Sequence, residues 1–140
     1  MVQIVLDTNV VVSGLISAEN PPGRIIDGVR GDEIQLCLDD RIFREYREVL
    51  ARPELARWIH PEDSLAILDH IRNSARYIIG ALTIQGLPDP NDAPFAEVAT
   101  MGGVPLVTGN IRHFPGETVG STSVLTPRQF IDTLGERVAR

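Results

Sequence analysis

Short apolar runs alternate along the chain with longer segments in which apolar residues recur at helical spacing. The short runs are bounded by polar or turn-forming residues and predict β-strands at 2–6, 34–39, 104–108 and 121–126. The longer segments predict helices at 8–18, 22–31 and 40–52, from 61 onward, ahead of 102–103, and from 127 onward. The stretch 75–84 is apolar and β-prone, but its pattern does not fix its state.

The alternation of strands and helices predicts an α/β fold with a central, mainly parallel sheet flanked by helices on both faces. We find no linker or internal repeat, and we expect one domain over 1–140. Ligands of such sheets bind beyond the carboxyl ends of the strands. Asp7 follows the first strand and Asn110 follows the run 104–108, so we expect both side chains at this edge.

The composition narrows the function classes. A net charge of −6 argues against strong nonspecific binding of nucleic acid by the whole surface, but leaves a carboxylate metal site open. The chain has no lysine, which excludes a P-loop lysine and a Schiff-base lysine, and its single cysteine excludes a thiolate zinc site. No apolar run approaches the roughly 18 residues of a membrane span, and no basic segment precedes the first one. We therefore expect a cytoplasmic protein without a signal peptide or a membrane span.

Two acidic residues stand where a carboxylate can point inward. Asp7 lies between an apolar strand and an apolar helix, a position that suits a helix cap and an active-site carboxylate equally. In "DRIFREYREVL", the helical period places Glu45 beside the apolar face and Glu48 toward solvent. Glu45 can therefore reach into a cleft, or pair at the surface with Arg41, four residues earlier.

The segment "DPNDAPFAEVA" holds two more candidates. Asp89 precedes Pro90, the usual arrangement of an N-cap before a proline in the first turn. If Asp89 caps the helix, Asp92 is free of that task. Asp92 then shares a helical face with apolar residues, which makes it a candidate site residue, and Asp89 a neighbour of the site.

Three carboxylates that converge at one sheet edge repel one another unless a cation lies between them. Mg²⁺ and Mn²⁺ prefer oxygen ligands and need few carboxylates. Such ions activate water and offset the charge that develops during phosphoryl displacement. Asp7, Glu45 and Asp92 therefore indicate a metal-dependent hydrolase that cleaves phosphodiester bonds.

At this point the sequence resembles the PIN-domain nucleases, specifically the VapC-like toxin branch. The stretches "VLDTNVVVSGL", "FREYREVL", "DPNDAPFAEVA" and "LVTGNIRHF" resemble the four motifs of that family, in order and over nearly the whole chain. The resemblance implies a compact three-layer α/β/α fold and a Mg²⁺- or Mn²⁺-dependent endoribonuclease that acts on RNA. It also implies a homodimer and, in many relatives, a toxin of a type II toxin–antitoxin system that a small antitoxin silences.

The resemblance assigns catalytic roles to Asp7, Glu45, Asp92 and Asn110, with the three carboxylates as metal ligands. Its fourth motif often carries Asp where this chain has Asn110, which can ligate through its carbonyl oxygen but adds no negative charge. Supporting residues are Asn9 and Asp89, together with Thr108, whose hydroxyl, like that of Thr8, can bond a carboxylate of the site or the turn backbone. Arg112 and His113 are candidates for contact with an RNA phosphate, and a solvated loop is the alternative.

Two rival enzyme classes are excluded because the chain has no lysine. A haloacid-dehalogenase-like phosphatase needs a second Asp two residues after the first, where this chain has Asn9, and also a lysine. A receiver domain needs a lysine as well. The remaining alternative is a catalytically attenuated PIN fold that acts as an RNA- or protein-binding module. Asn110 and the acidic net charge favour it, and the three carboxylates oppose it.

Overall fold

A five-stranded parallel sheet forms the centre of the molecule. The computed structural model describes residues 1–139, with side chains described through Gly135. The strands lie in the order β3-β2-β1-β4-β5, and every neighbouring pair is parallel. Their bounds are Val2–Leu6 (β1), Ile34–Leu38 (β2), Arg76–Tyr77 (β3), Leu106–Val107 (β4) and Val124–Leu125 (β5). The predicted α/β fold with a parallel sheet is confirmed.

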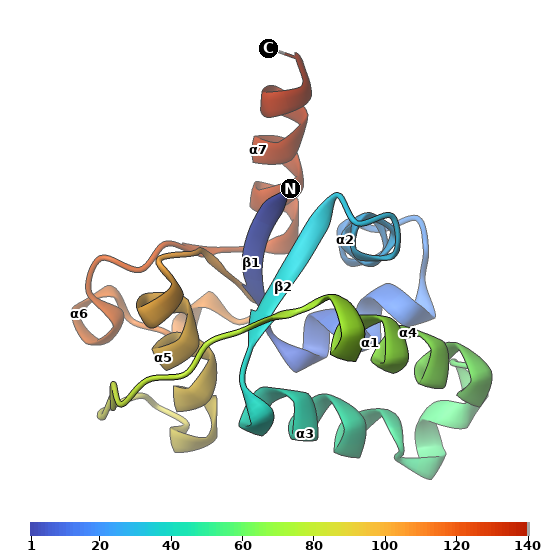
Figure 1. Ribbon diagram of the computed structural model, residues 1–140, viewed down its shortest axis with the longest axis horizontal. Coiled ribbons are helices and arrows are strands. Elements are labelled where there is room, and N and C mark those ends of the chain that lie inside the picture. The colour runs from blue at the N-terminus through green and yellow to red at the C-terminus, as the bar shows by residue number, and fades with distance from the viewer. Residues whose placement is uncertain (140) are drawn as a thin grey trace.

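Helices cover both faces of the sheet, which makes a three-layer α/β/α fold. Figure 1 shows α5 and α6 on one side of the strands and α1, α2 and α4 on the other. Helix α3 runs along the bottom of the view and contacts both α1 and α5. The helix bounds are Thr8–Ile16 (α1), Pro21–Arg30 (α2), Asp40–Leu50 (α3), Pro61–Ser74 (α4), Ala93–Gly102 (α5), Gly116–Val119 (α6) and Pro127–Ala139 (α7). Short 3-10 helices span Pro53–Arg57 (η1), Pro90–Asp92 (η2) and Ile111–His113 (η3).

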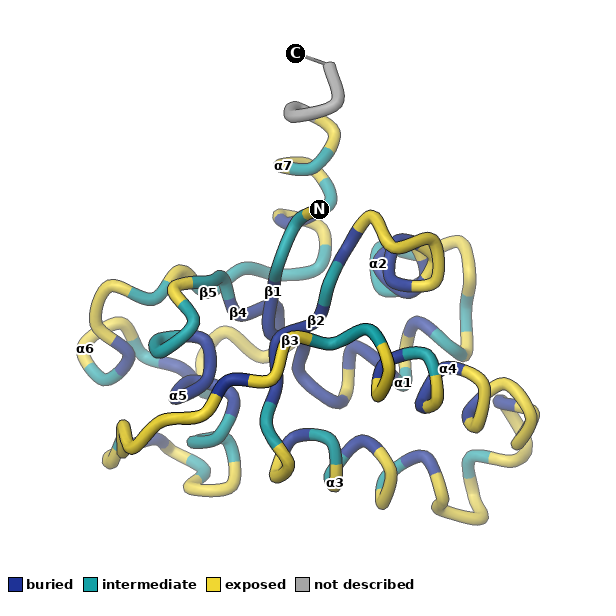
Figure 2. Tube along the Cα trace, viewed as in Figure 1, coloured by how far each residue is buried: buried dark blue, intermediate teal, exposed yellow. Residues whose placement is uncertain are grey.

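The core lies between the sheet and the two helical layers. The central strands are its most buried part, as the dark tube of β1, β2 and β4 shows in Figure 2. The predicted apolar face of α3 packs there through Ile42, Tyr46 and Leu50, while Glu48 is exposed. Cys37 is a buried free thiol of β2. Burying apolar residues from every layer favours folding by removing their surface from water.

Local sequence signals set several helix ends. Asp39 caps α3 by accepting a hydrogen bond from Ile42 N–H at 3.1 Å. At the start of α7, Thr126 and Gln129 exchange side-chain-to-backbone hydrogen bonds in a capping box. Helix α5 ends at Gly103, which has φ 64, a left-handed conformation that glycine adopts without strain.

The structure differs from the sequence expectation at short elements. The predicted strands 104–108 and 121–126 are each reduced to two residues, and the 3-10 helices and α6 were not predicted. The undecided stretch 75–84 contributes only β3 and then runs along the surface, where Ile79 is 97% exposed. Within the described residues, no helix has both the length and the apolar character needed to cross a membrane.

Candidate functional site

The carboxyl edge of the sheet brings together the two polar strand ends that the sequence predicted. Leu6 of β1 lies in register with Val107 of β4, so Asp7 and Thr108 follow at the same level. Thr108 Oγ1 donates a hydrogen bond to Asp7 Oδ2 at 2.7 Å, and both side chains are buried. The same threonine oxygen accepts a hydrogen bond from Asn110 N–H at 3.0 Å. Thr108 therefore bonds a carboxylate and the turn backbone together.

Asp7 does not act as a helix cap. It precedes α1, but its side chain makes no capping hydrogen bond there. Burial raises the pKa of Asp7 above its usual value, the Thr108 hydroxyl lowers it, and the negative charge of Asp92 raises it further. Burial and the nearby charge of Asp92 both disfavour the ionised form of Asp7. A cation bound beside these carboxylates would offset this cost.

Glu45 joins this edge from α3. Thr8, the first residue of α1, donates its hydroxyl hydrogen to Glu45 Oε2. Tyr46, the next residue of α3, donates its phenolic hydrogen to the backbone oxygen of Leu6. Burial and the charges of Asp7 and Glu45 raise the pKa of Tyr46, which keeps it protonated as a donor. These contacts fix α3 to the end of β1. The alternative surface pairing of Glu45 with Arg41 is wrong, because Arg41 pairs with Asp39 and Glu97 instead.

Asp92 reaches the site from the start of α5. Asp89 caps η2 by accepting a hydrogen bond from Asn91 N–H at 3.0 Å, as predicted, and Asp92 makes no capping bond. Asp92 Oδ2 lies 3.1 Å from His113 Nδ1. Burial raises the pKa of Asp92, and the negative charges of Asp89 and Glu45 add to this, against the opposing effect of His113. Asp92 therefore interacts electrostatically with both Asp7 and Glu45.

Most of the other predicted residues are exposed. Asn9, Asn110 and Arg112 are exposed, and the hydrogen bonds of the described residues include none from their side chains. His113 lies 3.1 Å from Asp92 with its side chain 45% exposed, and Arg112 is exposed, so RNA contact and a solvated position stay open for both. Asp7 and Asp92, and Asp92 and Glu45, thus lie within range of each other's charge, while Asn110 is exposed beyond Thr108.

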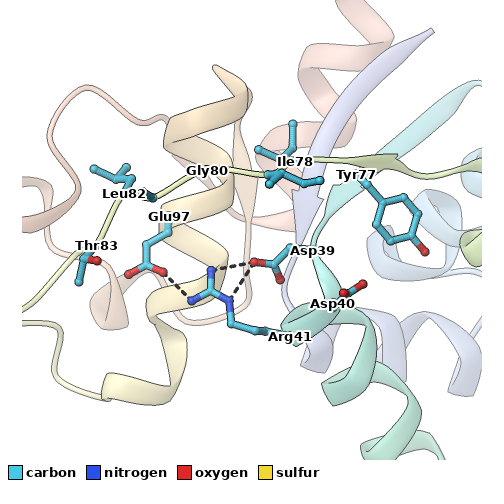
Figure 3. Close-up of a pocket in the computed structure, with 11 residues that line it drawn as sticks. Asp39, Asp40, Arg41, Tyr77, Ile78, Gly80, Leu82, Thr83 and Glu97 are labelled. Atoms are coloured by element: carbon cyan, nitrogen blue, oxygen red, sulfur yellow. Dashed lines mark hydrogen bonds and ion pairs between the residues drawn. The ribbon is translucent and has the colours of Figure 1, made fainter.

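A second polar cluster was missed by the sequence reasoning (Figure 3). Arg41 Nη1 lies 2.8 Å from Glu97 Oε1, and Arg41 Nη2 lies 2.7 Å from Asp39 Oδ2. Glu97 Oε2 accepts a hydrogen bond from Ile84 N–H at 2.8 Å. Glu97 is buried in α5 between buried neighbours. A single acidic residue inside the apolar run "FAEVA" was the sequence signal that could have predicted a buried, paired carboxylate. The cluster ties α3, which carries Glu45, to α5, which follows Asp92.

Asp7, Glu45 and Asp92 offer carboxylate oxygens, the type of ligand that a hard divalent cation prefers. Glu45 is held through Oε2 by Thr8, and Asp92 through Oδ2 by His113, which leaves the second oxygen of each carboxylate outside these contacts. Carboxylate oxygens are the ligands that Mg²⁺ and Mn²⁺ prefer. Across the residues whose side chains are described, no three His, Cys, Asp or Glu side chains are gathered closely enough to enclose an ion as they stand.

Comparisons with known proteins agree with this architecture. The family described as PIN domain matches residues 3–112. A solved structure of VapBC2 from Rickettsia felis, bound to a DNA fragment from their promoter, matches with a TM-score of 0.53 and 15% identity, covering 90% of this chain and 98% of that chain. At this identity the likeness shows a shared fold. No curated protein matches the chain.

Proposed function

Because the chain belongs to the PIN-domain family, we propose that it is a Mg²⁺- or Mn²⁺-dependent endoribonuclease whose metal ligands are Asp7, Glu45 and Asp92. The observation that carries the proposal is electrostatic. A buried carboxylate, Asp7, has its pKa raised by burial and by Asp92, which in turn lies in the field of Glu45. Three segments far apart in sequence supply these charges. A divalent cation bound among the three carboxylates offsets their mutual repulsion.

The chain's own residues orient the three carboxylates. Thr108 donates to Asp7, Thr8 donates to Glu45, and the His113 ring lies against Asp92, so each carboxylate has one oxygen fixed. A divalent cation, when bound, lowers the pKa of an attacking water and offsets charge that develops on the phosphate. Asn110 stands at the rim, where its amide oxygen adds a neutral ligand or orients the substrate.

We further propose that the enzyme is the toxin of a type II toxin–antitoxin system, acting in the cytoplasm as a homodimer with an antitoxin as partner. The similar fold of the VapBC2 structure from Rickettsia felis supports the antitoxin as partner. The experiment is co-expression with the product of the adjoining gene. An antitoxin is expected to co-purify and to suppress cleavage, and an adjoining gene product that does neither contradicts this part of the proposal.

The direct test of the activity is cleavage of a labelled single-stranded RNA by the purified chain with Mn²⁺, with Mg²⁺ and with EDTA. We expect cleavage with either metal and none with EDTA. Asp7→Asn keeps an acceptor for the Thr108 hydroxyl but removes the charge, and is expected to lose cleavage about 100-fold or more, as for loss of a group that stabilises developing charge. Cleavage that persists in EDTA, or in Asp7→Asn at the parent rate, contradicts the mechanism.

Asn110 favours a second candidate, a catalytically attenuated PIN fold that binds RNA or protein. Its exposed amide replaces a carboxylate at the edge of the site and leaves it one negative charge weaker. The two candidates differ in one result. An attenuated fold binds RNA without cleaving it in Mn²⁺, and the nuclease turns it over.

A further inference from the structure

The chain between β3 and η2 runs along the surface in an extended form. Residues 78–87 contain no helix, strand, turn or bend, and Figure 1 shows them leaving the sheet and passing toward α5. Two hydrogen bonds hold this extended segment. Ile78 N–H donates to the backbone oxygen of Leu38 in β2 at 2.9 Å, and Ile84 N–H donates to Glu97 Oε2 at 2.8 Å. The segment is therefore fixed at two points, with 79–83 between them.

The backbone between these two points is unpaired. Within the described residues 1–139, the backbone of 79–83 neither donates nor accepts a hydrogen bond. β3 is an edge strand of the sheet, and the N–H of Ile78 points toward β2. Because an extended chain alternates, the N–H groups of Ile79 and Ala81 point away from β2. An exposed edge of this kind is a place where a further strand can pair.

Apolar side chains accompany this unpaired backbone. Ile79 is 97% exposed and Leu82 is 40% exposed. Gly80 lies against α5, because a Cβ there would come within 2.3 Å of Met101 Sδ. The stretch 77–87, "YIIGALTIQGL", contains neither a charged residue nor a proline. It therefore lacks the features that usually keep an exposed edge from pairing with another chain.

A groove of about 550 Å³ lies between this segment and the N-terminus of α3 (Figure 3). The seven consecutive residues 77–83 line it on one side. As an extended chain they span about 20 Å. Its other lining residues are Asp39, Asp40 and Arg41 at the start of α3 and Glu97 of α5. A hollow that follows an extended chain over this length suits a second extended strand.

The charges in the groove favour a basic partner. Three carboxylates and one guanidinium line it, which gives a formal charge of −2. Arg41 pairs with Asp39 and Glu97. Asp40 is exposed in the first turn of α3, and among the residues whose side chains are described it forms no ion pair. A lysine or arginine in the groove would therefore find a free carboxylate.

We propose that this groove binds an extended segment of another protein, which pairs with the backbone of 79–83 as an added strand and places a lysine or arginine beside Asp40. Apolar side chains on one face of the bound segment cover Ile79 and Leu82. A second copy of this chain fits less well, because its own stretch 77–87 has no basic residue to bring to Asp40. The proposal uses no residue of the proposed metal site and is independent of the nuclease function.

The probe is a display library of random peptides of about nine residues, long enough to cover 77–83. It is selected against the purified full chain. We expect the enriched peptides to carry apolar residues at alternate positions and at least one lysine or arginine, because an added strand presents every second side chain to one face. The most enriched peptide is then synthesised with fluorescein, and its affinity is measured by anisotropy. No enrichment, or enriched peptides rich in acidic residues, overturns the proposal.

Two variants test the backbone and the charge separately. Ala81→Pro removes a backbone N–H that points away from β2, and its control is Gln85→Pro, exposed on the same segment but outside the groove. Asp40→Asn removes the free carboxylate, and its control is Asp63→Asn in the first turn of α4. We expect Ala81→Pro to weaken peptide binding about tenfold and Asp40→Asn about threefold, as for one backbone hydrogen bond and one exposed ion pair. Both controls should bind as the parent does, and unchanged binding in both test variants overturns the proposal.

Replacing the basic residue of the peptide by glutamine identifies its partner. The change should weaken binding to the parent about threefold and have no further effect on Asp40→Asn, since the pair is then already broken. An equal loss with both proteins would show that the basic residue binds elsewhere, against the proposal. Size-exclusion chromatography tests the other occupant. A parent dimer that Ala81→Pro converts to a monomer would show that the segment pairs with a second copy, which also overturns the proposal.

Discussion

Thr108 donates a 2.7 Å hydrogen bond to Asp7 across 101 positions of sequence, and neither side chain has appreciable contact with solvent. The bond joins the ends of β1 and β4, which are neighbours in the sheet. It also fixes Oδ2 of Asp7, the carboxylate on which the proposed mechanism depends most. The threonine therefore links the stability of the sheet edge to the orientation of a proposed metal ligand.

Replacing Thr108 by valine should lower both stability and activity. Valine keeps the shape but removes the donor to Asp7 and the acceptor for Asn110 N–H. A hydrogen bond to a charged group contributes about 1.5–3 kcal/mol, so the free energy of unfolding measured in urea should fall by that order. Thr108→Ser retains the hydroxyl and is the control. A valine variant as stable as the serine variant would show that the hydroxyl is dispensable.

Asp7→Asn should stabilise the metal-free protein while it abolishes activity. Burial raises the pKa of Asp7 above 3.8, which means that the folded state disfavours its charge at neutral pH. The amide removes this cost and keeps an acceptor for Thr108. In EDTA at pH 7 we expect a melting temperature about 3 °C higher than that of the parent, equivalent to about 1 kcal/mol in a chain of this size.

The same substitution gives a prediction for pH. Above the raised pKa of Asp7, the folded parent carries the whole cost of the buried charge. As pH falls through that pKa toward 3.8, the carboxyl is protonated in the folded state and the cost disappears. The advantage of Asp7→Asn in EDTA should therefore shrink on acidification, as measured by thermal denaturation from pH 7 to pH 4. An advantage that grows toward acid would contradict the assigned direction.

Arg41→Met should destabilise the contact between α3 and α5. It leaves the buried Glu97 carboxylate without its cation, although Glu97 still accepts from Ile84 N–H. The expected loss is about 1–3 kcal/mol, below that of a fully buried pair, because the Arg41 side chain is 47% exposed. Since these helices position Glu45 and Asp92, weaker Mn²⁺ binding should accompany the loss. Arg44→Met, on the exposed side of the same helix, is the matched control and should change neither.

Asn110→Asp should strengthen metal binding. Asn110 is exposed at the end of β4, where a carboxylate adds a negative charge without burying it. We expect the Mn²⁺ concentration for half-maximal cleavage to fall severalfold, with a higher rate at low metal. An unchanged metal titration would show that the amide serves as well as a carboxylate at this position.

The long periodic elements could be predicted from the sequence because their burial follows the pattern of apolar residues. The apolar face of α3 placed Glu45 correctly, and Asp89 capped η2 as its position before Pro90 indicated. The parallel sheet predicted that Asp7 and Asn110 lie at its carboxyl edge, but not that β1 and β4 are neighbours. What could not be predicted is the direction of individual hydroxyls, such as that of Thr108 toward Asp7, because it depends on side-chain geometry.

Other features lay beyond pattern reasoning because non-local contacts decide them. The stretch 75–84 is β-prone, yet its strand is limited to Arg76 and Tyr77, with one further hydrogen bond from Ile78 N–H to Leu38 of β2, and Ile79 stays in solvent. Arg41 stands four residues before Glu45, a spacing that favours a local pair. It pairs instead with Glu97, 56 positions away, because α3 and α5 meet in the fold.

Mn²⁺ binding measured by calorimetric titration tests the central claim most directly, because it asks whether Asp7, Glu45 and Asp92 form one metal site. The variants are Asp7→Asn, Glu45→Gln and Asp92→Asn, with Asp63→Asn on the exposed side of α4 as the matched control. We predict that the parent and the control bind Mn²⁺ with the same affinity, and that each of the three variants binds at least about tenfold more weakly. A parent that binds no Mn²⁺, or three variants that bind it as tightly as the parent, would contradict the account.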